Sequence, residues 1–180
     1  MNKKLLVGAL VFVGLSLTSF KADETVDVNW LTFEEAVEKL KTEKKKVFID
    51  VYTDWCGWCK VMDKNTFSQP IIAQYLNENF YPVKLDAEQK EDITFNGVTY
   101  KFVPSGRNGY HQLAAALLQN KLSYPQFVIL NEKMEIINIT AGYQKPEPFH
   151  KIISFYNEDS YVSKEEAAKF EKEYKSPFSE

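Results

Sequence analysis

Residues 47–60 read VFIDVYTDWCGWCK and join an almost continuous apolar run to two cysteines. The run over residues 47–52 is typical of a central β-strand that is buried on both faces of a sheet. From Cys56 to about Phe67 the sequence favours a helix. The two cysteines are therefore expected at the first turn of a helix that directly follows a buried strand.

Cys56-Gly57-Trp58-Cys59 has the spacing of a redox-active cysteine pair. Two thiols at this spacing in the first turn of a helix can close a small, exchangeable disulfide ring. The helix N-terminus stabilises a thiolate on the first cysteine. Cys56 is therefore expected to attack a partner disulfide, and Cys59 to resolve the mixed disulfide that forms.

Three other roles for the cysteine pair fit the sequence less well. A structural disulfide gains more by closing a longer loop. A zinc site would need a second pair of cysteines, which the chain lacks. A haem attachment motif would need a histidine at position 60, where the chain has Lys60.

Asp50 is a carboxylate inside the apolar run of residues 47–52. Burial of such a group is unfavourable and raises its pKa. We expect Asp50 to accept the proton of Cys59 when that thiol resolves the mixed disulfide. The alternative is an acid at a strand end that reaches solvent. Lys84, in the strand predicted over residues 80–85, is either an ionic partner of Asp50 or an ordinary surface lysine.

Tyr124-Pro125 directly precedes a predicted strand over residues 126–130. The peptide bond before a proline is the only one for which the cis form is cheap. We expect a cis bond that brings the backbone of Tyr124 beside the disulfide, with a trans bond at a strand start as the alternative.

The rest of the chain alternates strands with helices and contains no internal repeat. Further strands are predicted over residues 27–31 and 135–141. Further helices are predicted over residues 33–41, from residue 70 onward, and over residues 111–120, 148–157 and 164–174. Asn96-Gly97 between β-forming residues predicts a hairpin over residues 94–100. The pattern predicts an α/β fold in which a central mixed sheet is flanked by helices.

Residues 1–22 have the features of a secretory signal peptide. Lys3 and Lys4 precede an uncharged apolar run over residues 5–17. A membrane anchor is the alternative, but a spanning helix needs about 20 apolar residues and this run is shorter. We therefore expect a mature, exported domain over residues 23–180 with no permanent membrane span. It would lie in the periplasm, or outside a cell that has no outer membrane.

Composition limits the remaining function classes. The chain has 180 residues, 44% of them hydrophobic, which suits one globular domain. Its net charge of −3 argues against a nucleic-acid partner that is held through phosphate groups. Two cysteines and two histidines exclude a disulfide-dense scaffold and a zinc finger. No metal and no cofactor are expected.

Residues 50–60, DVYTDWCGWCK, resemble the active-site segment of the thioredoxin superfamily. The continuation over residues 66–70, TFSQP, resembles the exported C-terminal domain of the thiol:disulfide interchange reductase DsbD. The similarity covers about residues 30–157. It implies a thioredoxin-like fold with a hairpin and a helix inserted over residues 87–120, before the cis-proline strand. Residues 158–180 would be a C-terminal helical extension.

The resemblance also implies roles for individual residues. Cys56 would be the attacking thiol, Cys59 the resolving thiol and Asp50 the buried acid, with Lys84 near it. Pro125 would be the cis-proline, and Gly142 would end the last strand at the substrate groove. The expected substrate-binding residues are Trp55, Gly57, Trp58, Tyr124, Pro125 and Gly142. Gly57-Trp58 between the cysteines, Tyr124 before the proline and the insertion depart from thioredoxin, and they leave redox direction and substrate open.

These observations predict an exported, monomeric thiol:disulfide oxidoreductase that reduces disulfides of exported proteins. Trp58 is neutral, and Asp54 and Asp50 would repel a thiolate on Cys56, which Lys60 offsets only in part. The thiolate should therefore be only mildly stabilised, which favours a reducing potential. Such a protein needs electrons from a membrane donor. The alternatives are a disulfide oxidase or isomerase, a reductant dedicated to one partner, and a non-catalytic binding module that kept the fold.

Overall fold

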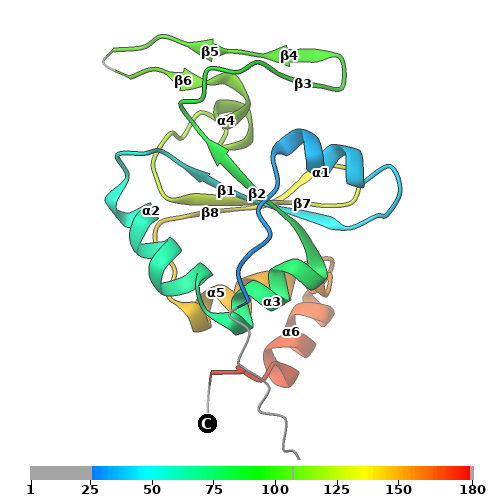
Figure 1. Cartoon of the computed structure of the whole chain (residues 1–180). Helices are drawn as coiled ribbons and strands as arrows, with labels where there is room; N and C mark the ends of the chain where they lie inside the picture. Colours follow the sequence, from blue (N-terminus) through cyan, green and yellow to red (C-terminus); the bar gives the residue numbers. More distant parts are fainter. Residues whose placement is uncertain (1–25, 107, 179–180) are drawn as a thin grey trace, which may run out of the picture.

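The computed structural model describes residues 26–106 and 108–178. A four-stranded sheet with the order β2-β1-β7-β8 forms its centre (Figure 1). β1 (Lys46–Tyr52) pairs in parallel with β2 (Phe80–Asp86) and antiparallel with β7 (Gln126–Leu130). β8 (Ile136–Ala141) adds antiparallel to β7. The predicted α/β fold with a mixed sheet is confirmed.

Helices cover both faces of this sheet (Figure 1). Val47, Ile49 and Val51 of β1 pack into the core that α1 (Phe33–Lys39) and α4 (Gln112–Leu117) complete. Phe48 packs into the other core, which is completed by α3 (Pro70–Asn79) and α5 (Pro146–Asn157). Alternate residues of a strand point to opposite faces, so Asp50 shares the face of Phe48.

The helix that begins after Cys56 has two parts. α2 (Gly57–Met62) is a regular α-helix, and η1 (Asp63–Phe67) continues it as a π-helix. Pro70 then starts α3 at the position where a helix tolerates proline. The predicted helical stretch to Phe67 is therefore confirmed, with a wider last turn than the sequence indicates.

The insertion over residues 87–120 contains more β-structure than the sequence predicted. β3 (Ile93–Phe95) and β4 (Val98–Tyr100) form the predicted hairpin, with positive φ angles at Asn96 and Gly97. A second pair, β5 (Phe102–Val103) and β6 (Tyr110–His111), extends the arm. Gly109 is required there, because a Cβ at this position would lie 2.4 Å from the Phe102 ring.

The prediction of a strand over residues 27–31 is wrong. Leu31 alone forms an isolated bridge, with Val83. The side chain of Asn77 on α3 instead bonds this segment, accepting from Asn29 N at 2.8 Å and donating to Asp27 O at 2.9 Å. These bonds satisfy backbone groups that a strand would have paired with a neighbour.

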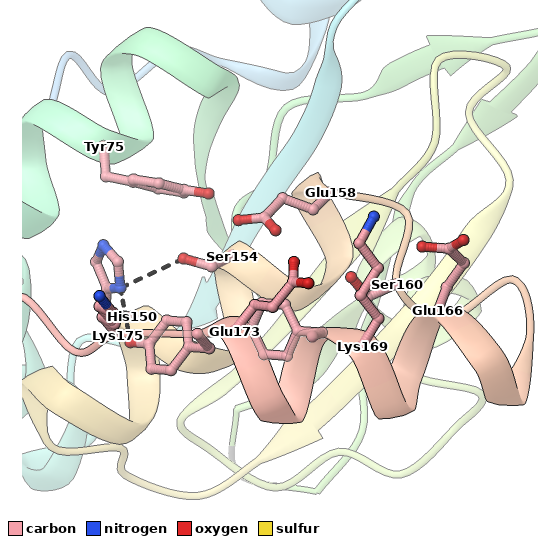
Figure 2. A pocket seen from close by; sticks show the side chains of 11 residues that line it. Tyr75, His150, Ser154, Glu158, Ser160, Glu166, Lys169, Glu173 and Lys175 are labelled. Atoms are coloured by element: carbon pink, nitrogen blue, oxygen red, sulfur yellow. Dashed lines mark hydrogen bonds between the residues drawn. The ribbon is translucent and has the colours of Figure 1, made fainter.

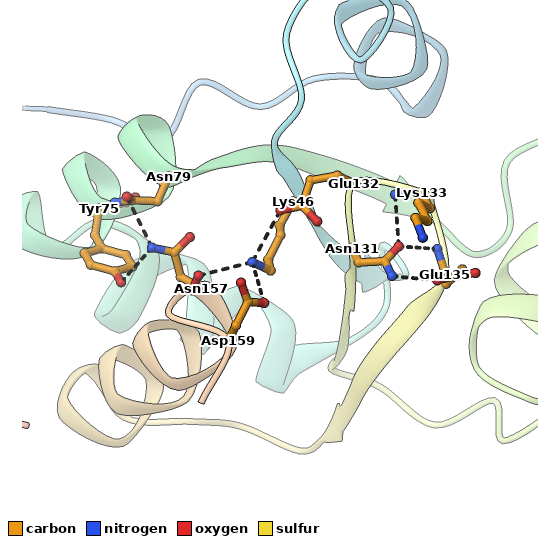
Figure 3. Close-up of polar contacts among 9 residues, drawn as sticks. All are labelled: Lys46, Tyr75, Asn79, Asn131, Glu132, Lys133, Glu135, Asn157 and Asp159. Carbon is orange, nitrogen blue, oxygen red and sulfur yellow. Dashed lines mark hydrogen bonds and ion pairs between the residues drawn. The ribbon is translucent and has the colours of Figure 1, made fainter. Parts of the chain in front are cut away.

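The C-terminal extension is tied to the sheet by Lys46, the first residue of β1 (Figure 3). Its buried Nζ lies 2.9 Å from Asp159 Oδ1 and 3.4 Å from Glu132 Oε1, and donates to Asn157 O at 3.1 Å. Burial lowers the pKa of Lys46, but the two carboxylates outweigh it and the pKa is raised. α6 (Lys164–Glu173), the predicted last helix, follows this cluster.

Two sequence expectations concern the membrane. The signal peptide predicted over residues 1–22 lies outside the described residues. Within residues 26–178, apart from residue 107, no helix is long and apolar enough to cross a membrane.

Candidate active site

Cys56 and Cys59 form a disulfide at the start of α2. Cys56 is the N-cap residue, and its Sγ accepts a hydrogen bond from Cys59 N at 3.0 Å. The turn is closed by a bond from Cys56 N to Thr53 O at 3.1 Å. The two residues are only 4% and 3% exposed. The predicted position of the pair, between a buried strand and the first turn of a helix, is confirmed.

A disulfide in this position can take up two electrons and two protons to give a dithiol. On reduction, the Cys59 N–H that now reaches Cys56 Sγ would stabilise a thiolate on that sulfur. Near-complete burial of Cys59 restricts proton exchange between its thiol and solvent.

Asp50 is a buried acid, 2% exposed, on the strand that leads to the cysteine pair. The parallel register sets it opposite Lys84, and Lys84 Nζ lies 2.8 Å from Asp50 Oδ2. Burial raises the pKa of Asp50 to about 6, because it outweighs the attraction of Lys84. Burial alone would lower the pKa of Lys84, but Asp50 and Asp63 raise it overall. Asp50 therefore does not reach solvent, and Lys84 is its ionic partner.

Asp63 is a third member of this cluster that the sequence analysis missed. It is the first residue of η1, and its carboxylate pairs with Lys84 Nζ. The same ammonium lies 4.9 Å from the ring centroid of Trp30 and 5.1 Å from that of Tyr52. Asp63 follows Cys59 by four residues, which places both on one helix face. This spacing of four residues from Cys59 is the sequence signal that could have identified Asp63.

Two exposed tryptophans flank the disulfide. Trp55 is 60% exposed and packs edge-on against Tyr124, with ring centroids 5.9 Å apart. Trp58 is 61% exposed and packs on Tyr143 at 5.7 Å. Trp55 Nε1 also donates to Glu88 Oε1 at 2.9 Å. Glu88 and Tyr143 were not among the predicted site residues, because loops far apart in sequence bring them here.

The backbone beside these aromatic pairs is formed by two loops. The Tyr124–Pro125 bond is cis, as expected. Pro125 O accepts from Gly142 N at 2.8 Å, so the two predicted groove residues are adjacent. Gly142 has a φ of +87°, which favours glycine. No atom lies within 4 Å of a Cβ built at Gly57 or Gly142, so both positions are open.

A polar cavity of about 330 Å³ lies between α5 and α6, away from the disulfide (Figure 2). His150 Nδ1 faces Tyr174 Oη at 2.9 Å and Ser154 Oγ at 3.3 Å there. Burial lowers the pKa of His150. The cavity lining contains no cysteine and includes Glu158 and Ser160, which flank Asp159, the partner of Lys46 at the start of β1. The described residues also contain no group of three or more His, Cys, Asp or Glu side chains that could hold a metal ion.

Comparison with known protein families gives one match over most of the chain. The family Thioredox_DsbH, described as "Protein of unknown function, DUF255", matches residues 18–163.

Two curated relatives match shorter stretches of the chain. Spermatogenesis-associated protein 20 from Rattus norvegicus is 33% identical over 84 residues, 46% of this chain and 11% of that protein. The thiol:disulfide interchange protein DsbD from Campylobacter jejuni (strain RM1221) is 30% identical over 60 residues, 33% of this chain and 10% of that protein. The chain therefore matches about a tenth of the length of these relatives.

Among solved structures, one titled "DsbH Oxidoreductase" superposes with a TM-score of 0.56 at 16% sequence identity. The superposition covers 81% of this chain and 94% of that chain. This likeness shows a shared fold.

Proposed function

The chain belongs to the Thioredox_DsbH (DUF255) family, and from this premise we propose that it is a thiol:disulfide oxidoreductase that reduces disulfides of exported proteins. One observation carries the proposal. A cysteine pair spans the first turn of α2, and Asp63, four residues after Cys59 on the same helix, joins the buried Asp50–Lys84 pair through Lys84 Nζ. A purely structural disulfide would not need a buried acid coupled to its helix.

The reaction has two exchange steps that use the reduced protein. The Cys56 thiolate attacks one sulfur of the substrate disulfide, forms a mixed disulfide and releases the other substrate sulfur as a thiolate. Cys59 then loses its proton, attacks Cys56 Sγ and releases the second substrate thiolate. The Cys56–Cys59 disulfide forms again, and two electrons have passed to the substrate, whose thiolates take up two protons.

Asp50 is the proposed acceptor of the Cys59 proton. With a pKa of about 6 its carboxyl group is mainly ionised at pH 7 and can take up a proton. Lys84 Nζ lies 2.8 Å from Asp50 Oδ2, and its positive charge offsets part of the cost of burying the carboxylate. Asp50 and Lys84 thus act in the second exchange step, whereas the Cys59 N–H supports the first.

Charge near the disulfide supports the reducing direction. A stabilised thiolate would make the protein an oxidant, and one N–H bond to Cys56 Sγ supplies part of that stabilisation. Asp54, two residues before Cys56, and Glu88, bonded to Trp55, bring negative charge to the same edge. The protein would draw its electrons from a membrane donor and act as a monomer.

The redox proposal is tested by turnover with dithiothreitol as the electron source. Catalytic amounts of the protein should accelerate the reduction of the insulin disulfides well above the rate with dithiothreitol alone. A rate equal to that of dithiothreitol alone would refute the redox function.

Export is the second part of the proposal. It is supported by the basic residues and apolar run at the N-terminus, and by the similarity to a DsbD protein. Intact-mass measurement of protein from the cell envelope should give a chain that begins near Asp23. A mass that still includes Met1 would contradict export with cleavage and favour an anchor.

A further inference from the structure

The sheet topology separates two kinds of surface on either side of the disulfide. At the edge where β1 leads into α2, the order β2-β1-β7-β8 places the end of β2 on one side and the end of β8 on the other. Asp86 ends β2 and Glu88 follows it. Gly142 and Tyr143 follow β8. A partner that reaches the disulfide therefore meets acids on one side and an aromatic pair on the other.

The acidic side carries charge that the described residues leave without an ion pair. Asp86 Oδ1 accepts from Glu88 N, and Glu88 Oε1 accepts from Trp55 Nε1, but no salt bridge forms at Asp54, Asp86 or Glu88 within residues 26–106 and 108–178. Lys90, two residues after Glu88, lies 3.0 Å from the ring centroid of Phe102 and forms no salt bridge with these acids, although its charge partly offsets the rise in the pKa of Asp86 that burial causes.

The negative charge of these carboxylates contributes to the raised pKa values of two neighbouring tyrosines. Burial raises the pKa of Tyr124 to about 12, and Glu88 and Asp86 add to the shift. Burial likewise raises the pKa of Tyr52, with Asp86 and Asp54 contributing. The three carboxylates therefore act on the same small region, beside the exposed ring of Trp55.

We propose that the protein prefers substrates with a basic side chain, arginine above all, next to the reactive cysteine. The guanidinium would stack on the exposed Trp55 ring and face Glu88 and Asp54, while the other flank of the peptide packs on Trp58 and Tyr143. An exposed indole beside carboxylates suits arginine, which stacks on aromatic faces and pairs with carboxylates at once. This inference rests on the proposed disulfide reduction and names its substrate class.

Three disulfide peptides test the preference. They are identical except that the residue next to the cysteine is Arg, Gln or Glu, and the second-order rate of their reduction by the reduced protein is measured. At low salt the Arg peptide should react about tenfold faster than the Glu peptide, a size typical of modest electrostatic steering. At 1 M salt the ratio should fall toward one, because the screening length is then about 3 Å.

A charge-removing variant identifies the residues responsible. Asp54→Asn with Glu88→Gln removes two charges and keeps a side-chain oxygen that can accept from Trp55 Nε1. The Arg-to-Glu rate ratio should fall by at least about threefold, a fraction of the roughly tenfold steering effect. Glu165→Gln with Glu173→Gln makes the same change in net charge on two exposed residues of α6 and should keep the wild-type ratio.

The possible results distinguish the arginine preference from the proposed disulfide reduction on which it rests. Equal rates for the three peptides, or a ratio that the control variant lowers equally, would overturn the preference and leave disulfide reduction intact. Failure to reduce any of the peptides would overturn both.

Discussion

Replacement of Cys56 by serine is expected to bring insulin reduction down to the rate of dithiothreitol alone. Cys56 Sγ caps α2 and is the sulfur that the Cys59 N–H can stabilise as a thiolate. A serine hydroxyl in that place neither ionises near neutral pH nor forms a disulfide. The loss should therefore be complete rather than partial.

Cys59→Ser is expected to fail in a different way. Cys56 can still attack the substrate, but no thiol remains to release it, so a mixed disulfide should accumulate. Intact-mass analysis after incubation with a disulfide peptide should show an adduct for Cys59→Ser and none for Cys56→Ser. Reduced wild-type protein, which also lacks the disulfide, is the matched reference for the stability of both variants.

The activity of Cys56→Ser also distinguishes an enzyme from a non-catalytic binding module. The exposed Trp55 and Trp58 could equally serve a binding module that no longer uses its cysteines. That alternative predicts that partner binding and biological activity survive Cys56→Ser. Full activity of this variant would contradict the enzyme assignment.

Replacement of Lys84 by methionine is expected to destabilise the folded protein by about 3 kcal/mol at pH 8. Asp50 would keep a buried negative charge without the ammonium that now lies 2.8 Å away. Removing one partner of a buried ion pair is costly for this reason, and Lys84 is partly accessible, which keeps the effect at the lower end of the usual range.

The effect of Lys84→Met should depend on pH. The folded-state pKa of Asp50, about 6, already exceeds the unfolded value of about 3.9. Its contribution to stability is therefore fully present below pH 4 and is lost as the pH rises through 6. Without Lys84 the folded pKa rises further, so the loss of stability at pH 8 grows. The difference between wild type and Lys84→Met should be small at pH 4 and largest at pH 8.

Urea unfolding at the two pH values measures this difference. Lys84→Met combined with Asp50→Asn should recover most of the lost stability, because no buried charge remains. Lys64→Met, on an exposed residue of η1, should change the free energy of unfolding by less than about 0.5 kcal/mol. A loss with Lys84→Met that is the same at pH 4 and pH 8 would show that the pair is not coupled through the charge of Asp50.

The centre of the site could be predicted because its signals are local. Cys56 and Cys59 lie in one turn, and Asp50 is the single charge in a run that otherwise reads as a buried strand. Each of these inferences needs only a short stretch of sequence and the period of a strand or helix. For Lys84 the sequence leaves both an ionic partner and a surface lysine open, and it is the parallel register of β1 and β2 that sets Lys84 opposite Asp50.

The parts that were missed depend on contacts between distant segments. Glu88 reaches Trp55 from the start of the insertion, and Tyr143 reaches Trp58 from the loop after β8. The β5–β6 pair has two residues per strand around a Gly- and Asn-containing turn, which reads as a loop. The strand expected over residues 27–31 failed because the side chain of Asn77 bonds its backbone.

The reduction potential of the Cys56–Cys59 pair tests the central claim most directly. The mature protein can be equilibrated with defined ratios of reduced and oxidised glutathione or dithiothreitol, and its free thiols alkylated and counted by mass. We expect a reversible two-electron transition nearer to −270 mV, the value of thioredoxin, than to the −120 mV of a strong oxidant. A value above about −180 mV would reverse the assignment to an isomerase or oxidase, and a disulfide that does not equilibrate at all would contradict redox function.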